Sequence, residues 1–129
     1  MELVAIVTLI AIVEFIVFGM KVGASREKYG VNAPATTGDE MFERHYRVHY
    51  NTLEQLIIFL PGLWLFGFYI EYSWAAGLGL IYIVGRAIYG VAYIKDPASR
   101  GIGMILSVLP CWVLILGGLV GAAWSLIVG

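Results

Sequence analysis

Long hydrophobic runs alternate with short polar segments along the chain. A helix needs roughly 20 apolar residues to cross a bilayer. Four runs meet this requirement, at about residues 3–22, 42–70, 73–94 and 102–128. The second meets it only with a polar helical segment that leads into an apolar run from about residue 53. The pattern predicts four transmembrane helices in one membrane domain, residues 1–129.

The links between these runs predict how the helices are arranged. The first link, "GASREKYGVNAPATTGDE", is long and polar, whereas the links around "EYS" and "KDPASRG" are short. Short links place neighbouring helices antiparallel. We therefore expect an all-α membrane protein, an antiparallel bundle of four transmembrane helices. The first run follows no basic segment, contains Glu14 and ends without a small-residue cleavage site, which favours a retained helix over a signal peptide.

Composition supports a membrane location and excludes several other classes. The chain is 60% hydrophobic and its mean hydropathy is +0.86, whereas soluble domains hold roughly 45–50% apolar residues. The net charge of −1 leaves no basic excess for nucleic acid. Cys111 lies alone in an apolar run and is expected to be inert. His45 and His49 are too few for a zinc site, so no metal is predicted.

The basic residues predict the orientation in the membrane. All eight lie in the first and third links or in the helix ends beside them: Lys21, Arg26, Lys28, Arg44, Arg47, Arg86, Lys95 and Arg100. By the positive-inside rule these links face the cytoplasm and both termini face the opposite side.

A polar stripe occupies one face of the second predicted helix. Because each helical residue turns by about 100°, Arg47, Asn51 and Glu54 fall within roughly 60° of one another. Glu43 lies one turn before Arg47 and is expected to pair with it. Glu43, Arg44 and Lys28 fit an ordinary interfacial surface. Asn51 and Glu54 fit it less well, because short side chains cannot reach far toward water.

A second polar stripe lies on the third predicted helix, where Arg86, Tyr89 and Tyr93 share a face. Arg86 lies about two and a half turns inside the helix end, where an unpaired guanidinium is costly. It therefore needs an anion, and Glu54 and Glu14 are the candidates. Glu14 could instead pair with Arg47, be protonated, or face a subunit interface.

Together the two stripes predict a polar cavity at the cytoplasmic end of the bundle. Excess arginine suits carboxylates, which guanidinium groups bind as a fork, and a glutamate suits an ammonium group. The residues therefore favour a small zwitterion with two carboxylates and one amine. The predicted lining is Arg26, Arg47, Asn51, Glu54, Arg86, Tyr89, Tyr93 and Arg100.

The same residues carry a resemblance to a known family. "FERHYRVHYNTLEQL" resembles the E-R-x-x-R-x-x-x-N-x-x-E motif of the MAPEG family, the membrane-associated proteins in eicosanoid and glutathione metabolism. "APATTG" resembles the loop before this motif in the leukotriene C synthases of the family. "GRAIYGVAY" and the later "LPC" resemble its microsomal prostaglandin E synthases.

The resemblance implies a homotrimer that binds glutathione between subunits near the cytoplasmic face. It implies that Arg100 stabilises the glutathione thiolate. Glutathione would be a cosubstrate, and no metal is implied. The residues that the resemblance assigns to glutathione binding are Arg26, Arg47, Asn51, Glu54, Tyr89 and Tyr93.

Departures from the family pattern bear on the substrate. Glu27 replaces an arginine and Gln55 replaces a tyrosine of the leukotriene C synthases, and Gly101 replaces a serine of the prostaglandin E synthases. These changes favour a detoxifying membrane glutathione transferase that acts on hydrophobic electrophiles, with peroxidase or isomerase activity as further options. Its location would be the inner membrane in a bacterium and the endoplasmic reticulum in a eukaryote.

Two other interpretations remain open at this point. A non-catalytic lipid-binding protein of the same fold would lack the glutathione pocket. A small transporter or channel subunit could use Glu14, Glu54 and Arg86 as a relay, but this would leave the number of arginines unexplained.

Overall fold

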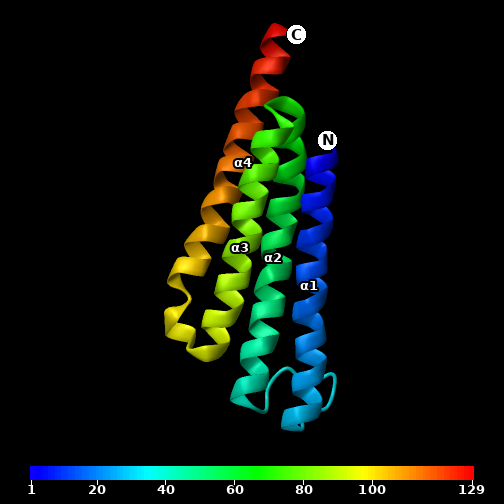
Figure 1. Cartoon of the computed structure of the whole chain (residues 1–129), viewed down its shortest axis with the longest axis vertical. Helices are drawn as coiled ribbons and strands as arrows, with labels where there is room; N and C mark the ends of the chain where they lie inside the picture. Colours follow the sequence, from blue (N-terminus) through cyan, green and yellow to red (C-terminus); the bar gives the residue numbers. More distant parts are fainter.

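The computed structural model describes all 129 residues, and helices are its only regular secondary structure. The four predicted helices are present, and each is long and apolar enough to cross a membrane. Successive long helices run in opposite directions, so α1 and α3 are parallel to each other (Figure 1). The elements are α1 Glu2–Tyr29, α2 Glu40–Tyr69, α3 Tyr72–Lys95, the 3-10 helix η1 Pro97–Ser99 and α4 Gly101–Val128.

Helix α1 is longer than the sequence predicted. The expected span ended near residue 22, but the helix continues to Tyr29 and includes Arg26 in its last turn. Gly23 does not interrupt it, because a single glycine costs a helix only about 1 kcal/mol. The helix ends at Gly30, whose positive φ of 71° allows its N–H to bond to the Arg26 carbonyl. The first link is therefore shorter than expected.

Acidic side chains begin the next two helices. The Asp39 carboxylate accepts a hydrogen bond from the backbone N–H of Phe42 at 3.0 Å, as expected of an N-cap residue. The Glu71 carboxylate accepts from the backbone N–H groups of Ser73 and Trp74 at 3.0 and 3.1 Å. The Ser73 bond is the main cause that lowers the pKa of Glu71. This cap is therefore present at neutral pH and is lost as the pH falls through that lowered pKa.

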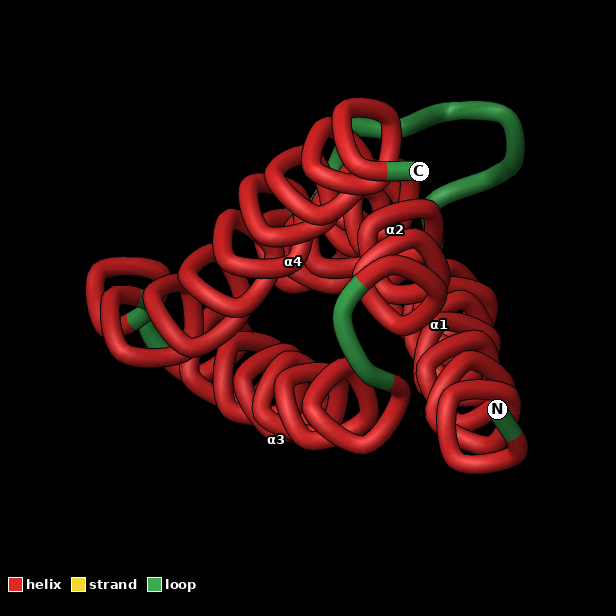
Figure 2. Tube along the Cα trace, turned by 90° about the horizontal axis from the view of Figure 1, so that it is seen from above, coloured by secondary structure: helices red, strands yellow, loops and turns green.

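Small residues allow the helices to approach closely. A side-chain carbon at Gly85 would lie 2.6 Å from the backbone of Leu106, so α3 and α4 are in backbone contact there. The main core includes Phe59 and Tyr82, whose rings stack at 3.9 Å between α2 and α3. Helix α1 packs on α2 and α3, and α4 packs on the other side of the same two helices. Figure 2 shows this arrangement from above.

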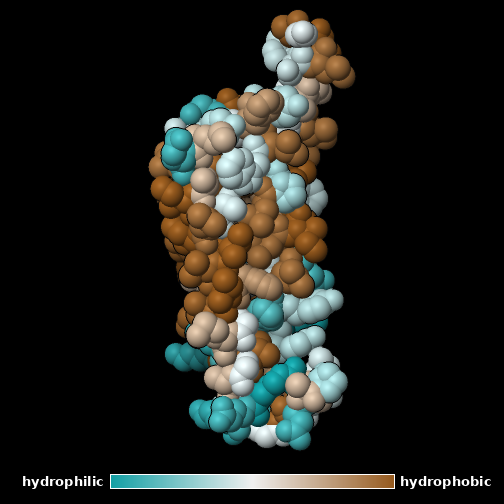
Figure 3. Space-filling model, turned by 90° about the vertical axis from the view of Figure 1, so that its right-hand side faces the viewer, coloured by the Kyte–Doolittle hydropathy of each residue, from teal (hydrophilic) through white to brown (hydrophobic).

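The surface divides into an apolar band and a polar end. Hydrophobic side chains cover most of the height of the molecule, and hydrophilic ones gather at the end with the α1–α2 loop (Figure 3). Many large apolar side chains are exposed on all four helices, such as Ile57 and Val91 at 68%. Such an apolar surface faces lipid or other protein rather than water. The chain is a multi-pass membrane protein.

Candidate functional site

Arg44 of α2 links that helix to the end of α3 at the polar end of the bundle. Its Nη1 donates to the carbonyls of Ile94 at 2.9 Å and Lys95 at 3.3 Å, at the end of α3. Its Nη2 pairs with Glu40 at 2.7 Å. These carbonyls have no partner within their own helix, so Arg44 both caps α3 and joins it to α2. The sequence had suggested only an interfacial role for Arg44.

A polar cavity of about 360 Å³ opens beside this link. It brings together Arg47 of α2 and Tyr93 of α3, two residues predicted for glutathione binding. The expected Glu43–Arg47 pair is not formed, because the Glu43 carboxylate accepts from the backbone N–H of Gly38 at 3.2 Å. Arg47 is exposed and unpaired. The complete lining is Thr36, Glu40, Glu43, Arg44, Tyr46, Arg47, Tyr93 and Pro97.

Arg86 connects the two predicted polar stripes deeper in the bundle. Its side chain is completely buried. One nitrogen, Nη2, donates to Asn51 Oδ1 at 2.9 Å and to Thr52 Oγ1 at 2.8 Å. The guanidinium carbon lies 4.2 Å from the centre of the Tyr89 ring, and Tyr89 stacks on Tyr93 at 5.6 Å. Asn51, Arg86, Tyr89 and Tyr93 therefore form one connected series that leads toward the polar cavity.

Arg86 does not pair directly with an acidic side chain. Neither Glu14 nor Glu54, the two predicted candidates, lies within ion-pair distance of it. Where the sequence predicts an anion beside Arg86, the structure has the Thr52 hydroxyl, which accepts a hydrogen bond from the guanidinium. The sequence signal that could have indicated this contact is the hydroxyl of Thr52, which follows Asn51 directly and lies on the side of α2 that packs on α3.

The other predicted residues do not line the polar cavity. The Arg26 guanidinium donates to the Ala35 carbonyl at 2.6 Å and lies over the Phe42 ring at 4.7 Å. Arg100 is exposed, precedes α4, and donates to the Pro97 carbonyl at 3.1 Å. Glu54 is exposed on α2 and makes no ion pair or hydrogen bond. One chain does not gather all the predicted residues around one cavity.

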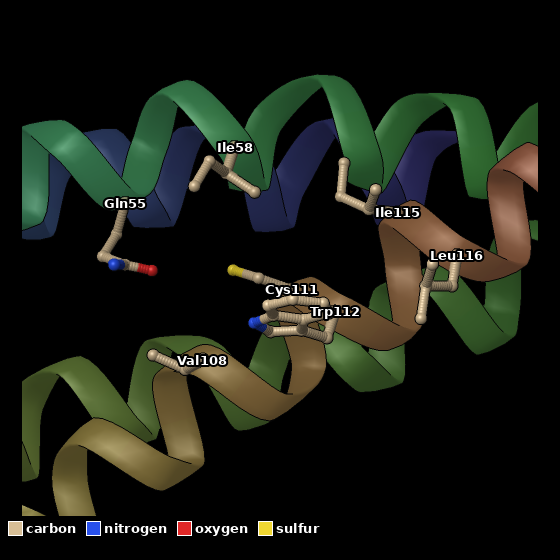
Figure 4. A pocket seen from close by; sticks show the side chains of 7 residues that line it. All are labelled: Gln55, Ile58, Val108, Cys111, Trp112, Ile115 and Leu116. Atoms are coloured by element: carbon tan, nitrogen blue, oxygen red, sulfur yellow. The ribbon is translucent and has the colours of Figure 1, made fainter.

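An apolar cavity of about 230 Å³ lies between α2 and α4 (Figure 4). The Gln55 amide and the Cys111 thiol extend into it from the two helices. Six of its seven lining residues are hydrophobic. Gln55 is thus the polar member of an otherwise apolar site, one turn beyond Asn51. The lining is Gln55, Ile58, Val108, Cys111, Trp112, Ile115 and Leu116.

The two cavities offer different chemistry. Arginine and tyrosine side chains beside the polar cavity suit an anionic, hydrogen-bonding ligand. The apolar cavity suits a hydrophobic one. Helix α2 contributes to both cavities: it lines the polar one together with the end of α3 and the apolar one together with α4.

Known proteins are similar to this chain over almost its whole length. The sequence profile of the MAPEG family matches residues 4–120. An uncharacterized protein of Synechocystis sp. is 45% identical over 122 residues, covering 95% of this chain and 89% of that protein. Human microsomal glutathione S-transferase 2 is 37% identical over 95% of this chain and 84% of its own length.

Bovine leukotriene C4 synthase is 33% identical, over 88% of this chain and 75% of its own length. The family match covers α2 and α3 completely and most of α1 and α4. With four membrane-spanning helices of this arrangement and a family match over most of its residues, the chain belongs to the MAPEG family.

Proposed function

We propose that the protein is a membrane-bound glutathione transferase. The observation that carries the proposal is the connected series of Asn51, Arg86, Tyr89 and Tyr93, which leads to the cavity lined by Arg47. Relatives named as a glutathione S-transferase and a leukotriene C4 synthase support the same reaction class. Glutathione peroxidase activity is a second reaction that the same thiolate would support.

Glutathione matches the chemistry of these side chains. It has two carboxylates, one ammonium group and one thiol. Arg47 and Arg26 would bind carboxylates as a fork, and Glu54 would bind the ammonium group. Asn51, Tyr89 and Tyr93 would supply hydrogen bonds along the tripeptide. Glutathione thus serves as a cosubstrate, and the reaction needs no metal.

Arg100 would stabilise the reactive thiolate. A free thiol has a pKa of about 8.5, and a nearby cation lowers it, which raises the thiolate population at neutral pH. Arg100 is exposed and has no acidic partner in the chain, so its charge remains available. The thiol proton passes to solvent, and the sulfur forms a bond to the electrophilic carbon as the leaving group departs.

A homotrimer would complete this site. Glu54 is exposed and unpaired although it lies where α2 enters its apolar run, which begins at about residue 53. A carboxylate facing lipid is costly, so a neighbouring subunit or a ligand at the interface should cover it. The same assembly would bring Arg26, Arg47 and Arg100 of adjacent chains around one ligand. The site would face the cytoplasm, with both termini on the opposite side.

The second substrate would be a hydrophobic electrophile that enters from the bilayer. The apolar cavity lined by Gln55 and Trp112 opens between α2 and α4 (Figure 4), and the apolar side chains of its rim, among them Trp112 and Leu116, are exposed. Detoxification of such compounds agrees with a site that holds only one polar side chain.

Conjugation of glutathione to a generic aryl halide tests the proposal. We expect the purified protein to catalyse it, and Arg100→Ser to reduce kcat/KM by about 100-fold or more, since one electrostatic contact to a developing anion contributes on this scale. Arg100→Lys, which keeps the charge, should retain more activity. A trimeric, folded protein without any glutathione consumption would contradict the proposal.

A non-catalytic lipid-binding protein is the second candidate. The apolar cavity and the exposed hydrophobic side chains on every helix favour it. Such a protein would bind lipid at the α2–α4 cavity but would neither bind nor consume glutathione, so the same assay separates the two candidates.

A further inference from the structure

Arg86 carries a positive charge in the centre of the bundle, and its hydrogen-bond partners are neutral. Asn51 and Thr52 both use Nη2, whereas Nε and Nη1 are buried and have no partner. A buried charge with unmatched donors is costly unless an opposite charge lies near it. We therefore expect an acidic side chain of another helix to lie near Arg86.

Glu14 of α1 lies at the same level as Arg86. Val7 lies against Gly79, and Phe18 lies against Gly90. Both contacts join parallel helices α1 and α3 with an offset of 72 positions along the chain (from 7 to 79 and from 18 to 90). Glu14 and Arg86 have the same offset and lie between these two contacts.

The helical period places both side chains on the facing surfaces. Positions 7, 14 and 18 fall on one face of α1, and positions 79, 86 and 90 fall on one face of α3. The contacts at the two glycines show that these faces meet. Glu14 is therefore the acidic side chain that faces Arg86 across the α1–α3 interface.

The unmatched polar atoms at this level complement one another. Glu14 Oε1 is a buried acceptor without a partner, and the Tyr82 hydroxyl, one turn before Arg86, is also unpartnered. Arg86 supplies the unmatched donors. A buried water usually makes about three hydrogen bonds to such groups, so a single water would link Glu14 and Tyr82 to one of the two free Arg86 donors.

We propose that Glu14 is the counter-ion of Arg86 and a positioning residue for the glutathione site. It acts through Arg86, which in turn holds Asn51 by a hydrogen bond and Tyr89 by its stacked guanidinium. Glu14 itself touches no substrate. This inference rests on the proposed function, because Asn51 and Tyr89 are two of the residues assigned to glutathione.

Loss of the Glu14 charge should weaken glutathione binding rather than the chemical step. An uncompensated Arg86 would shift toward water and release Asn51 and Tyr89, whereas Arg100 lies on a different element and would keep its position. The expected signature is a higher KM for glutathione with kcat nearly unchanged.

Glu14→Gln tests this expectation, with Glu2→Gln as the matched control. Glu2 lies on the same helix, at the end away from the polar cavity, and is exposed. Its replacement by glutamine removes the same charge. We expect Glu14→Gln to raise the KM for glutathione about 3- to 10-fold, the change that corresponds to one lost hydrogen bond. The control should equal the wild type. Equal KM values for the two variants would overturn the inference.

A double-mutant cycle shows whether Glu14 acts through Arg86. In an Arg86→Gln background, Glu14→Gln should not raise KM further. The same rise in KM in both backgrounds would overturn the inference.

The Glu14→Asp variant keeps the negative charge opposite Arg86. Its KM for glutathione should therefore lie between those of the wild type and Glu14→Gln. A KM for Glu14→Asp as high as that of Glu14→Gln would contradict the role of the Glu14 charge.

The two proposals fail differently. Wild-type protein that does not bind glutathione would overturn the proposed function and this inference with it. Wild-type protein that binds glutathione normally, together with a Glu14→Gln variant that matches its control, would overturn this inference alone.

Discussion

At the residue scale, a small side chain determines where a large charged one can lie. Thr52 is 1% exposed, and its hydroxyl donates to the Val48 carbonyl at 2.7 Å while it accepts from Arg86 at 2.8 Å. Both functions of the hydroxyl are thus in use. Without it, Arg86 would keep only Asn51 as a hydrogen-bond partner.

Replacement of Thr52 by valine removes the hydroxyl and keeps the shape. We expect Thr52→Val to lower the free energy of unfolding by about 1–3 kcal/mol, because a donor of a buried charged group loses its acceptor. Thr37→Val, in the exposed α1–α2 loop, is the control and should change stability little. Denaturant unfolding in detergent measures both. A Thr52→Val variant as stable as the wild type would show that Arg86 does not depend on this contact.

The residues of the site were predictable from the sequence in part. Helical periodicity groups Arg47 with Asn51 and Arg86 with Tyr89 and Tyr93, and the structure connects Asn51 to Arg86 and Tyr89 to Tyr93. The partner of Arg86 was not predictable. A single sequence does not determine how α2 is rotated about its axis, and that rotation decides that Thr52 rather than Glu54 faces α3.

At the element scale, close contact between α3 and α4 positions the tyrosine-bearing surface. A side-chain carbon at Gly103 of α4 would collide with the backbone nitrogen and Cα of Tyr89, and one at Gly85 of α3 would collide with the backbone of Leu106. Backbone atoms cannot move aside as a flexible side chain can. The sequence predicted both helices, but not which of their glycines are in contact.

Alanine at Gly103 should separate the two helices. We expect Gly103→Ala to lower the free energy of unfolding by about 1–3 kcal/mol, the usual cost of overpacking. Gly77→Ala, also within a helix, is the matched control because nothing lies within 4 Å of the added carbon. The control should be neutral or slightly stabilising, since alanine favours the helix. Equal melting temperatures for the two variants would contradict this contact.

The helix boundaries show a second limit of sequence reasoning. The four apolar runs predicted four helices, but hydropathy ends with the apolar residues and not with the helix. The last turns of α1, which carry Arg26, are polar and stop only at the left-handed Gly30. Backbone conformation, rather than hydrophobicity, sets that end and thereby the position of Arg26.

At the scale of the whole molecule, one chain has the parts of a site but does not enclose a ligand. Arg47, Glu54 and Arg100 are all exposed and have no charged partner, while Asn51, Arg86 and Tyr89 are connected inside the bundle. The exposed apolar faces of the helices leave room for further copies of the chain. In the proposed homotrimer, neighbouring chains would place these exposed charges around one tripeptide and so complete the glutathione site.

Thermal unfolding in detergent, with and without glutathione, tests the central claim most directly. A ligand that binds the native state stabilises it by mass action, by about 2.7 kcal/mol at a concentration 100 times its Kd. We predict that the Tm of the wild-type protein rises with glutathione concentration and that Arg47→Ala greatly reduces this rise. An unchanged Tm of the folded wild-type protein at saturating millimolar glutathione would contradict the account.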